Sequence, residues 1–177
     1  MEQPTIETER LVLRPFCKTD SKDVQELAGK REVSDTTLTI PHPYKDGMAE
    51  EWISKHPANW TNRTAVTYAI TDKVSKKLIG TVSLSKINDG EAELGYWIGL
   101  PFWDVGYCTE AASALVEFAF KNLDITIVIA EYLVSNPGSG RVMQKMGMRH
   151  IGRRRRLDRN NQMAQVEVYE ATNTTNT

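Results

Sequence analysis

The sequence has few cysteines and no long apolar run. Only Cys17 and Cys108 occur among its 177 residues, which is too few for a disulfide scaffold or a zinc site, so we expect reduced thiols and no bound metal. The longest apolar stretches have four residues or fewer, far short of the ~20 that cross a bilayer. Glu2 stands where a signal peptide would carry basic residues. These absences predict a cytoplasmic protein without a membrane segment.

An overall excess of charge is also missing. The chain has 22 Lys and Arg against 23 Asp and Glu, which argues against a nucleic-acid binder that uses its whole surface. Residues 141–159 differ from the rest, because they hold eight basic residues and Asp158 as their one acid. The run Arg153–Arg156 at their centre predicts either a surface for a ribosomal, RNA or other acidic partner, or a solvated strand and turn.

The length and the 40% hydrophobic content fit one domain with a core of its own. We expect this domain over residues 1–171, followed by a polar disordered tail over 172–177. Apolar periodicity and turn residues predict strands and helices in turn. The predicted strands are 6–14, 65–71, 77–87, 91–99, 125–134, 150–157 and 165–169, and the predicted helices are about 20–32, 46–59, 106–121 and 136–147. This order is typical of an α+β domain with a mixed, mostly antiparallel sheet of about seven strands and about four helices.

The segment after the strand 91–99 carries the strongest functional signal. A short turn with Gly106 connects this strand to the helix 106–121. Such a turn leaves backbone N–H groups unpaired at the positive end of the helix dipole. That arrangement favours an anion such as a pyrophosphate, although many helices begin in this way without a ligand.

Several spaced motifs in this region resemble those of one family. The runs Glu93-Leu94-Gly95-Tyr96-Trp97 and Gly106-Tyr107-Cys108-Thr109-Glu110-Ala111 resemble the acetyl-CoA-binding core of the GNAT acetyltransferases, most of all the RimJ/RimL type that acetylates ribosomal-protein N-termini. The run 136–147, with Asn136, Ser139 and a closing Met-Gly, is similar to the second signature of that family. The resemblance extends over about residues 6–170 and includes the opening run 10–16.

The resemblance implies how acetyl-CoA binds. The strands 91–99 and 125–134 would diverge, and the pantetheine arm would lie between them, next to backbone groups of Trp97 and Ile98. Asn136 would hold this arm or the diverging strand. The pyrophosphate would sit on the backbone N–H groups of Val105, Gly106, Tyr107, Cys108 and Thr109.

Acetyl transfer to an amine needs a group that removes a proton and a group that stabilises the departing thiolate. Glu93 is the candidate for the first role, directly or through water, because a carboxylate beside a half-buried cleft can have its pKa raised by desolvation. The family position of Ser139 suggests the second role. Both have simpler alternatives: Glu93 as an outward-facing strand residue and Ser139 as a solvated residue of a first helical turn. Asn136, likewise, is expected to cap its helix.

Three positions depart from the family pattern. Asp104 replaces a glycine and Val105 replaces a basic or amide residue, and both changes would weaken phosphate binding unless Asp104 turns away to cap the helix. Met143 stands where many members carry a tyrosine general acid, which leaves Ser139 or water as the proton donor. Cys108 replaces a small residue and is expected to be packed rather than reactive.

These observations give one leading function and two alternatives. The leading one is an acetyl-CoA-dependent N-acetyltransferase that modifies the N-terminal α-amine of a protein or peptide by direct attack in a ternary complex. The first alternative is acetylation of a small amine, such as a polyamine, an amino acid or an antibiotic. The second is a non-catalytic CoA- or RNA-binding module that uses Arg153–Arg156. The expected assembly is a monomer or a homodimer.

Overall fold

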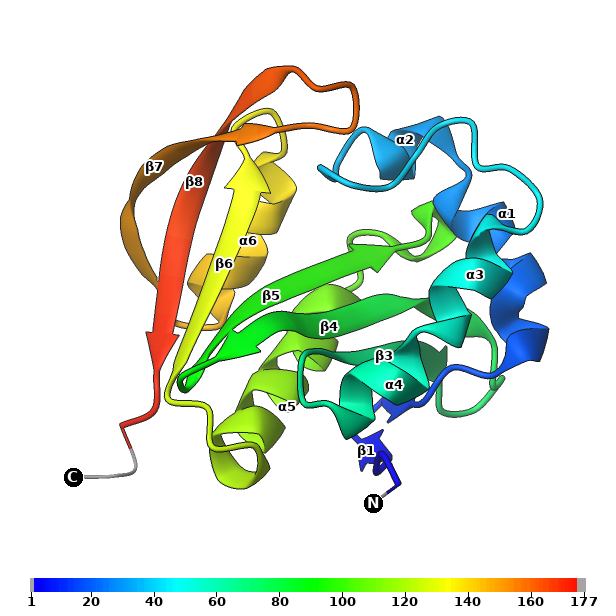
Figure 1. Ribbon diagram of the computed structural model, residues 1–177, viewed down its shortest axis with the longest axis horizontal. Coiled ribbons are helices and arrows are strands. Elements are labelled where there is room, and N and C mark those ends of the chain that lie inside the picture. The colour runs from blue at the N-terminus through cyan, green and yellow to red at the C-terminus, as the bar shows by residue number, and fades with distance from the viewer. Residues whose placement is uncertain (1, 175–177) are drawn as a thin grey trace.

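The computed structural model describes residues 2–174 and contains one sheet of eight strands, in the order β1-β2-β3-β4-β5-β6-β8-β7 (Figure 1). The strands are β1 Ile6–Glu7, β2 Leu11–Arg14, β3 Val66–Asp72, β4 Leu78–Asn88, β5 Glu91–Ile98, β6 Ile127–Leu133, β7 Arg149–Leu157 and β8 Met163–Thr172. The helices are α1 Ser21–Ala28, α2 Arg31–Ser34, α3 Met48–Ser54, α4 His56–Thr61, α5 Tyr107–Asn122 and α6 Pro137–Lys145. The predicted α+β class with a mixed, mostly antiparallel sheet is confirmed.

Helices cover both faces of the sheet. In Figure 1, α5 and α6 lie behind it, while α3 and α4 lie in front. The larger apolar cluster joins α5, through Ala111, Leu115 and Ala119, to the rear side chains of β2–β6. A smaller cluster joins α1 and α3 to Trp97 on the front of β5. Because the strands between these layers are buried on both sides, the central sheet is a rigid base for the region where β5 and β6 meet.

Strands β5 and β6 form a wedge that is open at one end. They pair in parallel from Glu91 with Ile127 to Leu94 with Ala130, and no pair follows beyond Leu94. Further along, β5 stays paired with β4 as far as Ile98, and β6 stays paired with β8 as far as Leu133. Each strand follows its other neighbour, so the two separate, as Figure 1 shows. The predicted divergence of these strands is confirmed.

Several predicted elements are divided in the structure. The strand 6–14 is broken by a turn in which Thr8 N–H donates to Leu11 O at 3.0 Å, which raises the number of strands to eight. The helix 20–32 ends at Ala28 and is followed by the short α2. The helix 46–59 is divided into α3 and α4, since Pro57 has no N–H to continue the first helix and fits the first turn of the next.

Strand β6 and the chain end also differ from prediction. The β-branched residues of 125–134 favour a strand buried on both faces, but within β6 only Val128 and Ala130 are fully buried, because the other face borders the wedge. Strand β8 includes Thr172, and Asn173 N–H donates to Thr126 O at 2.8 Å, so order extends past the predicted domain boundary at 171. Residues 175–177 of the predicted tail lie outside the described residues.

Candidate acetyl-CoA and acceptor site

A cleft of about 980 Å³ lies at the open end of the wedge. Its walls come from β5 and β6, from the N-terminal ends of α5 and α6, from α3, and from the loop 36–41. Of the predicted site residues, all but Val105 line this cleft: Glu93, Trp97, Ile98, Gly106, Tyr107, Cys108, Thr109, Asn136 and Ser139. Residues more than forty positions apart in sequence therefore meet at one surface.

The turn before α5 presents free backbone donors. Glu110 has the first N–H group that makes a helical hydrogen bond at this end of α5. It donates to Gly106 O at 3.1 Å. Within residues 2–174, no hydrogen bond is made by the N–H groups of residues 104–109. Gly106 has φ +85°, a left-handed conformation in which a side chain is strained. These donors at the positive end of a 16-residue helix fit a pyrophosphate group.

Arg10 lies beside this turn, a contact that was not predicted from the sequence. Its guanidinium donates to Val105 O at 2.8 Å and to Glu110 Oε2 at 2.7 Å. It also lies over the Tyr107 ring, 4.7 Å from the ring centroid. A Cβ atom added to Gly106 would stand 3.2 Å from Arg10 Nη2. Arg10 thus brings guanidinium N–H donors to the turn, while Glu110 balances its charge.

Asp104 adopts a backbone conformation that explains the usual glycine at this position. Its φ is +61°, in the left-handed region that Asp tolerates better than most residues. The side chain is exposed and does not cap α5. The alternative in which Asp104 turns away from the phosphates to cap α5 is therefore wrong. The acid remains close to the turn.

The diverging part of β5 offers backbone groups to the wedge. Gly99 N–H donates to Ile79 O at 2.8 Å, so alternation along the ladder directs the backbone of Trp97 toward β4. The backbones of Tyr96 and Ile98 face the opposite way, toward the wedge. The Ile98 carbonyl accepts the Trp103 indole N–H at 2.7 Å, which leaves its N–H as the group available there. The backbone groups predicted to face the pantetheine arm at Trp97 and Ile98 are therefore those of Tyr96 and Ile98. The indole ring of Trp97 packs with α1 and α3.

Asn136 does not cap α6 with its side chain, contrary to expectation. Its Nδ2 donates to Thr36 O at 3.3 Å, across to the loop that follows α2. Its carbonyl accepts the N–H of Ser139 at 3.2 Å. Asn136 therefore connects α6 to the front wall of the cleft.

Ser139 meets a partner that the sequence did not suggest. Its hydroxyl lies 2.7 Å from the Tyr96 hydroxyl, which also lies 3.2 Å from the Ser139 carbonyl oxygen. Met143, at the position where related enzymes were expected to carry a tyrosine, is buried in the main core. A tyrosine hydroxyl is thus present at the cleft, but it comes from β5 rather than from α6.

Cys108 is a packed, neutral thiol. Burial raises its pKa to about 12, so it stays protonated at neutral pH. A thiol in this state is a poor nucleophile, which confirms the expectation of a packing role.

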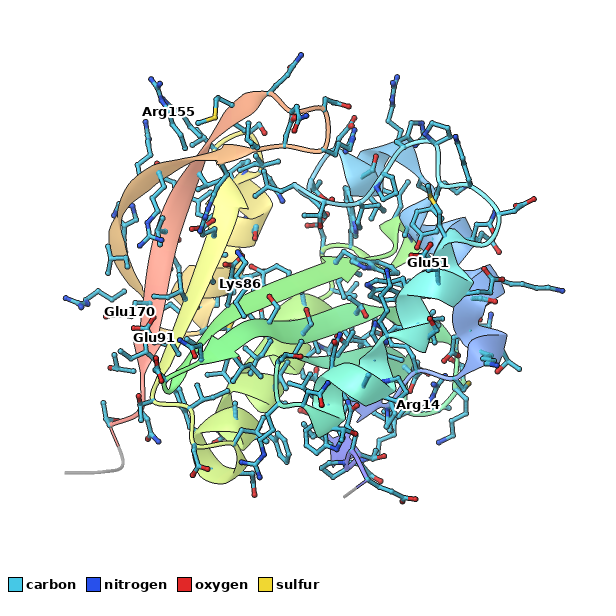
Figure 2. All side chains as sticks on the ribbon, viewed as in Figure 1. Arg14, Glu51, Lys86, Glu91, Arg155 and Glu170 are labelled. Atoms are coloured by element: carbon cyan, nitrogen blue, oxygen red, sulfur yellow. The ribbon has the colours of Figure 1, made fainter. Side chains whose placement is uncertain are left out.

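Glu93 lies among cations rather than in an apolar pocket. Lys86 Nζ stands 2.6 Å from its carboxylate, and Arg156 Nη2 stands 4.0 Å away. Its side chain is 30% exposed. Figure 2 shows Lys86 at the gap between β5 and β6. The desolvation expected from sequence is therefore replaced by ion pairing, which holds the carboxylate in place beside the cleft.

The arginine-rich strand β7 uses most of its charge within the protein. Glu131, whose side chain is 4% exposed, accepts two hydrogen bonds from Arg156 at 2.7 Å and lies 3.6 Å from Arg154. Arg153 pairs with Glu167 on β8. Arg155 has no ion pair within residues 2–174, and Figure 2 shows it pointing outward. Further pairs join Arg149 to Glu170 and Arg159 to Asp35. Arg155 is therefore the one arginine of this strand without an ion pair in the described chain, and a role of Arg153–Arg156 in partner binding stays a prediction.

Comparison with known proteins agrees with this geometry. Residues 10–149 match the acetyltransferase (GNAT) domain model, so the chain belongs to the GNAT family and is an acetyltransferase. It is 26% identical over 151 residues to the uncharacterized N-acetyltransferase YoaA of Bacillus subtilis, covering 84% of this chain and 85% of YoaA. It is 36% identical over 157 residues to the FsC-acetyl coenzyme A-N(2)-transacetylase of Aspergillus fumigatus, covering 84% of this chain and 66% of that enzyme.

Solved structures share the fold. RimL, a ribosomal L7/L12 alpha-N-protein acetyltransferase solved with coenzyme A, superposes with a TM-score of 0.86 at 17% identity, over 96% of this chain and 98% of RimL. The predicted GNAT family is confirmed by the match over residues 10–149, and RimL shares its fold. Among the described residues, no helix is long and apolar enough to cross a membrane, and no cluster of side chains could hold a metal ion.

Proposed function

We propose that this acetyltransferase modifies the α-amino group at the N-terminus of a protein or peptide. The observation that carries the proposal is the cleft itself, which is wide and has mixed charge. Seven charged residues line it, four acidic and three basic: Glu51, Glu93, Asp104, Glu131, Lys55, Arg141 and Lys145. A deep, strongly acidic pocket would select small cationic amines, whereas a long cleft of balanced charge suits a peptide terminus.

The residues of the wedge fit acetyl-CoA. The unpaired N–H groups of residues 104–109 and the guanidinium of Arg10 would hold the phosphates, and the backbone groups of Tyr96 and Ile98 would hold the pantetheine arm. Acetyl-CoA supplies an activated acetyl group, whose bond to sulfur breaks as the bond to the amine nitrogen forms. In this proposal Glu93 takes the proton of the attacking amine, directly or through water, and Ser139 donates a hydrogen bond to the thiolate. An N–H of β5 that faces the wedge would stabilise negative charge on the carbonyl oxygen.

A screen of acceptors tests the proposal. Purified protein and acetyl-CoA are incubated with peptides that have free or blocked N-termini, each containing a lysine, and with polyamines, amino acids and aminoglycosides. We expect mass spectrometry to find one acetyl group on the peptides with a free α-amine and none on the blocked peptides. Acetylation of the small amines alone would contradict the proposal.

A second candidate is an acetyltransferase for a small amine. The Aspergillus relative, at 36% identity, is named FsC-acetyl coenzyme A-N(2)-transacetylase, a name that gives a nitrogen of FsC rather than a protein N-terminus. The same screen separates the two candidates, because the acceptor series contains both classes of amine.

A further inference from the structure

A tyrosine and a serine face each other across the wedge. Tyr96 belongs to the part of β5 that has left β6, and Ser139 belongs to the first turn of α6, which packs behind β6. Their hydroxyl oxygens are 2.7 Å apart, the usual distance for a hydrogen bond between two hydroxyl groups. Both residues line the cleft. This contact lies where the thioester of acetyl-CoA would have to react.

The direction of this hydrogen bond follows from the neighbouring acceptors. Tyr96 has one proton and two acceptors in reach, the Ser139 hydroxyl at 2.7 Å and the Ser139 carbonyl at 3.2 Å. The carbonyl lies within α6, where it accepts the N–H of the fourth residue along the helix. The hydroxyl is both the closer and the less occupied acceptor. With Tyr96 as the donor, the proton of Ser139 is free to point elsewhere.

We propose that Tyr96 is a positioning residue whose O–H donates a hydrogen bond to Ser139 Oγ. This hydrogen bond turns the O–H of Ser139 toward the wedge. This inference rests on the proposed acetyl transfer and adds to it a residue that directs the serine hydroxyl. Without Tyr96, the serine hydroxyl would rotate freely and spend part of its time bonded to backbone carbonyls.

The surroundings keep Tyr96 in the role of a donor. Burial raises the pKa of Tyr96 well above its usual value, with a further contribution from the neighbouring Cys108, so the phenol keeps its proton throughout the working pH range. A phenol that holds its proton this firmly is a poor final proton source for a thiolate. Tyr96 therefore orients the Ser139 hydroxyl, and Ser139 donates the hydrogen bond to the thiolate.

The test measures the thiol pKa of CoA bound to the protein, by the ultraviolet absorbance of the thiolate. A hydrogen bond to the thiolate favours the charged form, so the thiol pKa of CoA should be lower in the wild-type complex than in the Tyr96→Phe complex, by about one unit. Ser139→Ala should raise it equally, and the double variant should raise it no further. The matched control is Tyr68→Phe, which removes the hydroxyl of another buried tyrosine that donates to Pro4 O outside the cleft.

Kinetics provide the second readout. Tyr96→Phe should lower kcat about 10-fold or more, with the KM for acetyl-CoA changed less than about 3-fold. An unchanged thiol pKa in Tyr96→Phe, with CoA still bound and acetyl transfer intact, would overturn this inference and leave the proposed function standing. Failure of CoA to bind the wild-type protein would overturn both.

Discussion

The turn before α5 and the strand β7 contrast in how charge in the sequence relates to charge at the surface. Residues 104–109 contain an acid and no base, yet they present unpaired N–H donors beside the guanidinium of Arg10. Strand β7 contains five arginines, yet four of them pair with carboxylates of β6 and β8. The anion site is therefore expected at residues 104–109, although β7 contains many more basic residues.

The difference has a geometric cause. Backbone donors at a helix start cannot be paired within the helix, so they stay available whatever the side chains are. Arginines on a strand lie beside the residues opposite them on the neighbouring strand, on the same face of the sheet, and here those residues include carboxylates. Arg149 is paired with Glu170, and Arg153 is paired with Glu167. A run of like charge in the sequence thus says little until its cross-strand partners are known.

The largest expected effect comes from blocking the turn. Acetyl-CoA at 100 times its Kd should stabilise the wild-type protein by about 2.7 kcal/mol, measured as a rise in Tm. Gly106→Trp should abolish this rise, because the side chain would fill the space beside the unpaired donors. Gly147→Trp is the control, since Gly147 also has positive φ but has open space around it outside the cleft. A full rise in Gly106→Trp would place the phosphates elsewhere.

Glu93 lines the cleft and lies 4.0 Å from Arg156 of β7, and its removal should act on rate rather than on binding. Glu93→Gln removes the proton acceptor but keeps the shape, so kcat should fall about 100-fold or more, the usual contribution of a general base. The Kd for acetyl-CoA, measured by calorimetry, should stay within about 2-fold. Glu91→Gln, two residues earlier on the same strand and exposed, should leave the rate unchanged. An unchanged rate in Glu93→Gln would remove Glu93 from the mechanism.

Two adjacent arginines of β7 should differ in their effect on stability. Arg156→Met leaves Glu131, with a side chain only 4% exposed, facing Arg154 alone at 3.6 Å. The free energy of unfolding should fall by about 2 kcal/mol, below the range for fully buried pairs because Arg156 is 35% exposed. Arg155→Met should change it by less than about 0.5 kcal/mol. Equal effects in urea denaturation would show that the pairs of β7 do not hold the hairpin.

A buried histidine extends the comparison to a polar group without a partner. His56 packs against Phe16 and Trp52, with ring centroids 5.4 and 4.4 Å away. Neither of its nitrogen atoms has a hydrogen-bond partner among residues 2–174, and burial lowers its pKa from 6.5 to about 4.

Because the unfolded chain takes up this proton near pH 6.5 and the folded protein does so only near pH 4, stability is lost as the pH falls through that interval. Between pH 7 and pH 5 the wild-type protein should lose about 2 kcal/mol more than His56→Phe does. Urea denaturation at both pH values measures the difference, and parallel losses would contradict it.

The smallest effect is expected for RNA binding by β7. With Arg155 as the one arginine of this strand that lacks an ion pair in the described chain, the protein should bind RNA weakly, and the slope of log K against log salt should be about −1 or shallower. A slope of −4 or steeper in a filter-binding assay, reduced by Arg155→Gln, would restore the view of β7 as a nucleic-acid surface.

Parts of the site follow from local sequence and others do not. The strand, the short turn with Gly106 and the following helix predict free N–H donors, because all three lie within one stretch of chain. The contact of Arg10 with Val105 joins segments that are far apart in the sequence, so hydrophobic periodicity could not predict it. The ion pairs of β7 with β8 could have been found from the hairpin register, which places glutamates opposite arginines. The pair of Arg156 with Glu131 required the position of β6 as well.

The sequence by itself determined the class of the fold, the family and the location of the turn that faces the wedge. These properties depend on the hydrophobic period, on turn residues and on motifs. All three are local patterns within short stretches of chain, so they can be recognised without knowing the tertiary structure. Tertiary structure alone decided which charges remain free and which hydroxyl faces Ser139. Those outcomes depend on the distance between side chains from separate strands, and such distances are fixed only when the sheet is assembled.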